Sequence, residues 1–149
     1  MNAMDKYAGI ILRILGDNRI EGVYDPVNGL VYIFHEDDAY GCVCNLFSLY
    51  GPHLESRLVC AMRPAHEDAR LVRACLSGIN RLLGWDGFYL DPVTGCIACS
   101  VDYTVPVTGL RYGDADLERF CTQAWKTYFN NRNTLSRMIR RMYDTGEAE

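Results

Sequence analysis

The sequence predicts an α+β protein in which helices cover a mainly antiparallel sheet. Apolar residues recur every three or four positions near both ends and in the middle of the chain, the period of amphipathic helices. Short runs rich in valine, isoleucine, tyrosine and phenylalanine lie between these segments, as in strands. Strands and helices do not alternate strictly, which argues against a parallel βαβ sheet. The predicted order is α-β-β-β-β-α-β-β-α, in a single domain spanning residues 1–149.

Three segments have the apolar stripe of an amphipathic helix. The first runs from Asp5 to Leu15, where Gly16 is expected to end it, and the second follows Pro64 and ends at Gly84. The third is one long helix with acidic residues in its first turn, where they match the helix dipole. The stripes are Tyr7, Ile10, Ile11, Ile14 and Leu15; Leu71, Val72, Cys75, Leu76, Ile79, Leu82 and Leu83; and Leu117, Phe120, Cys121, Ala124, Trp125, Tyr128, Phe129, Leu135, Met138, Ile139, Met142 and Tyr143.

Between the first two helices, strand-forming residues are separated by turn residues, the pattern of an antiparallel meander. A further hairpin follows the middle helix and turns between Asp91 and Gly95. The strands are expected at Ile20–Tyr24, Leu30–His35, Tyr40–Tyr50, Leu54–Met62, Trp85–Leu90 and Cys96–Val105.

Composition excludes several classes of protein. The chain has 149 residues, 49% of them hydrophobic, which excludes a disordered protein. Its 15 basic and 19 acidic residues leave a net charge of −4, so nucleic acid and anionic membranes are not expected partners. No apolar run approaches the roughly 20 residues that span a bilayer, and the N-terminus does not resemble a signal peptide. We therefore expect a cytoplasmic protein.

Seven cysteines raise the question of a metal site or disulfides. All seven occur within apolar, periodic segments, where a reduced cysteine behaves as a small hydrophobe. Zinc needs four converging ligands, and Cys96 and Cys99, three apart in a predicted strand, would point to opposite faces. We therefore expect no metal, no cofactor and no disulfide. The cysteines are Cys42, Cys44, Cys60, Cys75, Cys96, Cys99 and Cys121.

No catalytic motif is present. The sequence has no glycine-rich phosphate loop, no Gly-x-Ser-x-Gly elbow and no His-Glu-x-x-His run. His35, His53 and His66 lie in or beside predicted loops, and a small-molecule sensor or a cysteine-dependent enzyme near these histidines is the alternative to a non-enzymatic protein. The aromatic residues of the last helix are assigned to the core. They are Trp125, Tyr128 and Phe129.

One stretch carries a family resemblance. Ile79–Leu83 ends a helix, Gly87–Asp91 and Gly95–Ala98 follow, and a long helix with a polar start comes next. This resembles the YbjN-like family of proposed bacterial sensory transduction regulators, which is similar in fold to type III secretion chaperones. The resemblance implies a secretion-chaperone-like α+β fold that binds other proteins, and no catalytic residue to carry over. The cysteine content and the bulky Trp85, Tyr89 and Tyr103 depart from the family pattern.

The longest predicted strand, Tyr40–Tyr50, is apolar on both faces. Helices on one side of the sheet would leave one face of this strand uncovered, and exposed apolar patches usually mark partner sites. We therefore expect a non-enzymatic protein-binding module, chaperone-like or a regulatory adaptor, that contacts a protein partner or a second copy of the chain. The expected partner-binding residues are Val43, Phe47 and Leu49, and the opposite face carries Cys42, Cys44 and Leu46.

Overall fold

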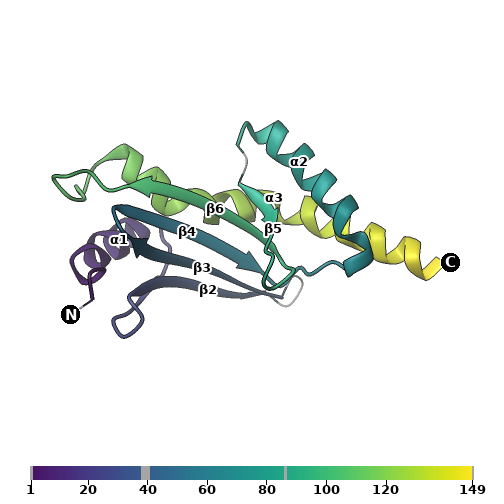
Figure 1. Cartoon of the computed structure of the whole chain (residues 1–149), viewed down its shortest axis with the longest axis horizontal. Helices are drawn as coiled ribbons and strands as arrows, with labels where there is room; N and C mark the ends of the chain where they lie inside the picture. The colour runs from purple at the N-terminus through teal and green to yellow at the C-terminus, as the bar shows by residue number, and fades with distance from the viewer. Residues whose placement is uncertain (1, 38–40, 86, 149) are drawn as a thin grey trace.

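The computed structural model describes the backbone of residues 2–37, 41–85 and 87–148, and their side chains apart from 37 and 139–148. Within these residues, six antiparallel strands form one sheet of order β1-β2-β3-β4-β6-β5 (Figure 1). The strands are β1 (Val23–Asp25), β2 (Leu30–Asp37), β3 (Gly41–Tyr50), β4 (His53–Cys60), β5 (Phe88–Leu90) and β6 (Ile97–Thr104), and the helices are α1 (Asp5–Asp17), the short 3-10 turn η1 (His66–Asp68), α2 (Ala69–Leu83) and α3 (Ala115–Ala148). The predicted fold class and order of elements are confirmed.

The first four strands form the predicted meander. The two-residue turn between β3 and β4 pairs Tyr50 with His53, and Gly51 in this turn has a φ of 56°, which glycine adopts without strain. After α2 the chain returns so that β6 pairs with β4 and the short β5 lies beyond it. Tyr40, which the sequence placed at the start of the third strand, lies outside the described residues.

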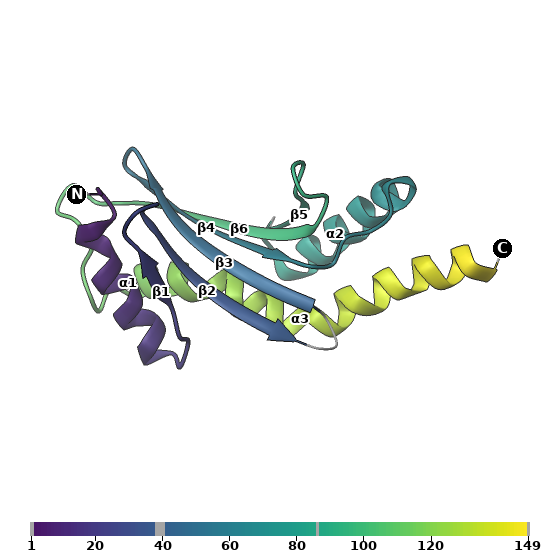
Figure 2. The same ribbon diagram turned by 90° about the horizontal axis from the view of Figure 1, so that it is seen from below.

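The helices pack on one face of the sheet, which we call the inner face. Phe47 of β3 lies in a buried cluster with Ile11 of α1 and Phe120 of α3. A second buried cluster joins other inner-face side chains to α2 and α3, and Trp125 contacts both clusters. Figure 2 shows α1 and α2 near opposite ends of the sheet, with α3 running along it and extending past the strands.

Helix α1 ends at Asp17, two residues later than its glycine predicts. Gly16 lies inside the helix, and the left-handed residue that closes it is Arg19, with a φ of 60°. The Ile20 N–H donates to the Leu15 carbonyl at 2.9 Å and the Arg19 N–H to the Gly16 carbonyl at 3.0 Å, the bond pair of a Schellman motif. Ile20 is therefore part of this cap, which explains why β1 begins at Val23 and not at Ile20.

The buried stripe of α2 is narrower than predicted. Val72 and Leu76 are 0% and 1% exposed, but Leu71 and Leu82 are 55% and 90% exposed. The side chain of Asn80 fixes the end of the helix to β5, because its amide donates to the Phe88 carbonyl at 2.9 Å and accepts from the Phe88 N–H at 3.0 Å. Gly84, with a φ of 67°, ends the helix as predicted.

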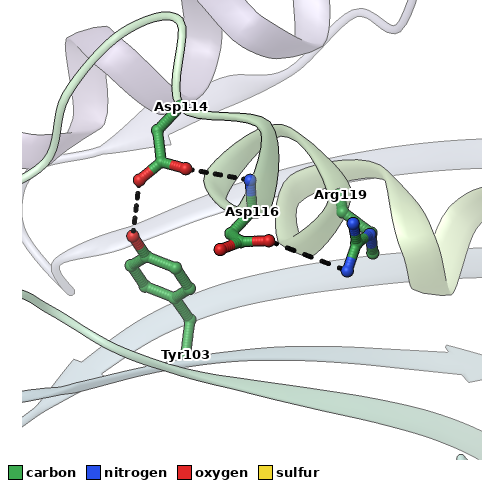
Figure 3. Close-up of polar contacts among 4 residues, drawn as sticks. All are labelled: Tyr103, Asp114, Asp116 and Arg119. Carbon is green, nitrogen blue, oxygen red and sulfur yellow. Dashed lines mark hydrogen bonds and ion pairs between the residues drawn. The ribbon is translucent and has the colours of Figure 1, made fainter.

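The start of α3 is capped by Asp114 (Figure 3). One carboxylate oxygen of Asp114 accepts from the Asp116 N–H at 2.9 Å, as an N-cap side chain does, and the Tyr103 hydroxyl lies 3.5 Å from the other. Asp116 in turn lies 3.7 Å from the guanidinium of Arg119, an exposed pair that adds little stability. The predicted long helix is confirmed, although the side chains of Ile139, Met142 and Tyr143 lie outside the described residues.

Candidate functional site

The three residues expected to bind a partner lie on the inner face. Val43 and Phe47 are 1% and 0% exposed, and the half-buried Leu49 packs against the core. Register is the physical reason: Phe47 pairs with Val31 and Val43 with His35, so these side chains share the face that the helices cover. The expectation that they line an exposed surface is therefore wrong. The face of β3 that the helices leave open is the opposite one.

That opposite face, the outer face, carries a contiguous apolar strip. Tyr32 pairs with Leu46, and Cys44 lies between Phe34 and Val59 in the ladder. Val23 and Phe34 are 48% and 57% exposed, and the other members are half-buried. None of these side chains belongs to either buried cluster of the described residues. We call this set the outer strip: Val23, Tyr32, Phe34, Cys44, Leu46 and Val59.

The rest of the outer face is polar. Arg57 lies beside Leu46, and its Nε is buried without a hydrogen-bond partner among the described residues. Glu55 and Asp102 pair with each other one step further along the sheet, followed by His53 opposite Thr104. The outer face therefore has an apolar half and an acidic half separated by one arginine, the mixture of apolar and charged area seen at protein interfaces.

A cleft opens at the edge of the sheet, beside α3. It is open to solvent, has a volume of about 380 Å³ and is lined by Arg19–Glu21, by Ile33–His35, and by Trp125 and Phe129. Among the described strands β1 pairs only with the first three residues of β2, so the rest of β2 has no strand on this side. The extended chain after the α1 cap and the side chains of α3 therefore form the walls.

Aromatic rings form much of this cleft. The His35 ring meets those of Trp125 and Phe129 edge to face, with centroids 6.4 Å and 5.3 Å away, and these two rings lie 4.8 Å from each other. Arg132 lies over the Phe129 ring at 5.3 Å. The assignment of Tyr128 to the core is confirmed, since it is 2% exposed, but Trp125 and Phe129 are half-buried and open onto the cleft.

The seven cysteines differ in burial. Cys60, Cys99 and Cys121 are buried, whereas Cys42 is exposed and Cys44, Cys75 and Cys96 are half-buried. No cysteine lines the cleft that contains His35. His53 lies beside Thr104, and His66 is exposed in η1. Over the described parts of the chain, no three metal-binding side chains are grouped so as to hold an ion.

Burial makes the inner thiols weak nucleophiles. Desolvation raises the pKa of Cys60 to about 11 and the pKa values of Cys99 and Cys121 to about 12. Since the thiolate is the reactive form, these three groups are unreactive at neutral pH. The cysteine-dependent enzyme that the sequence left open has no support from these positions.

The raised thiol pKa values predict a loss of stability in alkali. In the unfolded chain a thiol ionises near pH 8.5, so above that pH the unfolded state releases protons that the folded state retains. The free energy of unfolding should therefore fall as pH rises from about 9 to 11, by on the order of 1 kcal/mol per pH unit for each buried thiol. Urea unfolding at pH 7.5, 9 and 10 measures the slope. Cys99→Ala should reduce it, whereas Cys42→Ala, at an exposed position, should not; equal slopes in the two variants would contradict the assignment.

The sheet with one open face and helices on the other defines a small α+β protein with a YbjN-like fold. The chain is similar to YbjN from E. coli, a proposed transcription regulator, with a TM-score of 0.57 and 10% sequence identity over 89% of this chain and 93% of that one. It is also similar to a chain of the ExsC–ExsE complex, with a TM-score of 0.54 and 13% identity over 91% and 97% of the two chains. The resemblance expected from the sequence is thereby confirmed for the fold.

No protein-family model and no curated protein sequence matches the chain. None of the helices in the described segments is both long enough and apolar enough to cross a membrane.

Neither the outer strip nor the cleft follows from the sequence alone, although the sequence carries a signal for each. Leu46 and Cys44 form the second apolar face of β3, and His35 lies beside a predicted loop. The sequence carries no signal that Arg19 and Glu21 line the cleft, because their position depends on the direction that the chain takes after the α1 cap.

Proposed function

We propose that this protein is a non-enzymatic binding module that recognises a partner protein through the outer strip. The observation that carries the proposal is the side of the sheet on which the helices lie: they cover the inner face and leave Phe34, Leu46 and their neighbours to solvent. Burying apolar area stabilises a complex by about 25 cal/mol per Å² before the cost of association is subtracted. Contiguous apolar area on a sheet face is a feature that partner binding explains.

The likeness to a chain of the ExsC–ExsE complex supports this proposal, since that structure contains two different proteins. The likeness to YbjN, a proposed transcription regulator, supports a regulatory role. A second copy of the chain is an alternative occupant of the same strip. The mixed charge of the outer face, with Arg57 between the apolar half and the acidic pair of Glu55 and Asp102, suits either a folded partner or another copy.

A photo-crosslinking residue placed on the strip tests the proposal. Val23 and Tyr50 lie on the same face and are 48% and 52% exposed, but only Val23 belongs to the strip. A crosslinker at position 23 should give a discrete protein adduct in lysate of the source cell, and one at position 50 should not. An adduct of twice the chain mass identifies a second copy, and a different mass identifies another protein.

Competition establishes whether the adduct depends on the strip. An excess of the unlabelled protein should abolish it, whereas unlabelled Leu46→Gln should compete about tenfold less well, because an amide replaces an apolar contact on the strip. Ser48→Gln is the matched control, since Ser48 lies on the same strand and face but outside the strip. Equal adducts from positions 23 and 50, or equal competition by the two glutamine variants, would contradict the proposal.

A further inference from the structure

The cleft beside α3 has the chemistry of a small-molecule site, which goes beyond the proposed function. It is an open cleft of about 380 Å³, and the aromatic side chains of His35, Trp125 and Phe129 line it together with the charged Arg19 and Glu21. The rings of His35, Trp125 and Phe129 contact one another at interplanar angles of 90°, 79° and 51°, so they form an aromatic cluster held by two elements of regular structure. A ligand ring can join such a cluster through an edge-to-face or offset contact.

Two opposite charges lie on the same wall of the cleft. Arg19 and Glu21 both line it, two residues apart in the segment that links α1 to β1, and both side chains are exposed. Among the described residues, neither of them forms an ion pair. Because both groups face solvent, each of them is available to a ligand group of the opposite charge. A ligand with an ammonium group and a carboxylate on adjacent atoms would satisfy both.

The backbone at Arg19 is an independent reason to look for a role there. Arg19 occupies the left-handed position that closes α1, with a φ of 60°, where glycine is the favoured residue and any residue with a Cβ is strained. The cap itself uses only backbone groups of Arg19, so helix termination gives no reason for a guanidinium at this position. Strain of this kind is concentrated at functional sites.

We propose that the cleft binds a free aromatic α-amino acid as its zwitterion. The ring lies against Trp125 and Phe129, the carboxylate faces the Arg19 guanidinium, and the ammonium faces the Glu21 carboxylate. The site is separate from the outer strip except for Phe34, which borders both. The protein would then sense a metabolite at the sheet edge while it contacts its partner through the sheet face.

Calorimetric titration with L-phenylalanine and two analogues tests each charge separately. L-phenylalanine should bind with a Kd of about 0.1–1 mM, as expected for a ligand of its size. 3-Phenylpropanoate, which lacks the ammonium, and 2-phenylethylamine, which lacks the carboxylate, should each bind about tenfold more weakly, because one charge-assisted contact is lost. L-leucine, which lacks the ring, should also bind more weakly.

Each of two variants should abolish the difference in affinity between L-phenylalanine and one of its analogues. Arg19→Met should bind L-phenylalanine and 2-phenylethylamine equally, because the carboxylate no longer has a partner. Glu21→Gln should bind L-phenylalanine and 3-phenylpropanoate equally, for the corresponding reason. Arg73→Met is the matched control: Arg73 is an exposed arginine on α2, and its loss should leave all affinities unchanged. If Arg19→Met does not fold, Arg19→Gly removes the same charge and suits the left-handed backbone.

The outcomes that overturn the proposal are specific. No heat from L-phenylalanine at 10-fold above the expected Kd, analogues that bind as tightly as the amino acid, or the same loss in Arg73→Met as in Arg19→Met would each do so. None of these results bears on crosslinking from position 23, so failure of the cleft and failure of the outer strip are distinguishable.

Discussion

Replacing Phe47 by aspartate should unfold the protein. The Phe47 side chain is 0% exposed and meets Phe120 of α3 edge to face, with ring centroids 5.9 Å apart. Truncating a buried phenylalanine to alanine alone costs about 3–5 kcal/mol, and a buried carboxylate without a partner adds a penalty of several kcal/mol. The sum is comparable to the roughly 5–15 kcal/mol that stabilise a typical domain. Circular dichroism and a thermal melt should show loss of the folded spectrum and of the cooperative transition.

Phe34→Asp is the matched control for this substitution. It removes the same side chain from the neighbouring strand, but Phe34 is 57% exposed on the outer face, so the variant should keep the spectrum and melt within a few degrees of the parent. A folded Phe47→Asp protein with an unchanged melting temperature would show that β3 presents the other face to the helices. Val43, Phe47 and Leu49 would then lie on the open face of the sheet.

The strand β3 was predictable from sequence, but its face was not predicted correctly. Both of its faces are apolar, and the inner face is interrupted by a polar residue, Asn45, whose amide donates to the Ser56 hydroxyl at 2.9 Å inside the core. The residues that identify the solvent face of β3 are its neighbours on β4. The two-residue turn at Gly51 fixes the register and places Leu46 beside Arg57 and Ser48 beside Glu55. Charged neighbours indicate the solvent face, so the register identifies the open side.

The cleft depended on details that periodicity does not contain. The length of α1 is set by a cap that ends at Ile20 and leaves Gly16 inside the helix, and β1 is correspondingly short. Both features bring Arg19 and Glu21 to the uncovered edge of β2. The aromatic stripe of α3 was recognised, but its angular position relative to that edge is a property of tertiary packing. Trp125 and Phe129 therefore could not be told apart from Tyr128, which is buried.

Truncating Leu76 of α2 should cost far more stability than truncating Leu82 of the same helix. Leu76 is 1% exposed and lies in the buried cluster that contains Val43 and Leu135, so removing three carbons leaves a cavity between α2 and the sheet. Leu→Ala at such a site costs about 2–5 kcal/mol, because the transfer and cavity contributions add. Leu82 is 90% exposed, and its truncation should change the free energy of unfolding by less than about 0.5 kcal/mol.

The two alanine variants have the same chemistry and nearly the same helix propensity change, so burial is the only large difference between them. Urea midpoints measured at neutral pH, with the slope of unfolding held common, give the two free-energy changes directly. His53→Ala, in the turn before β4, is a second substitution expected to cost little, since its ring is half-buried and its side-chain partner is the exposed Thr104. Equal shifts for Leu76→Ala and Leu82→Ala would mean that α2 is rotated about its axis relative to the sheet. The apolar stripe read from the sequence, which includes both leucines, would then describe the packing better than the narrow buried stripe of Val72 and Leu76.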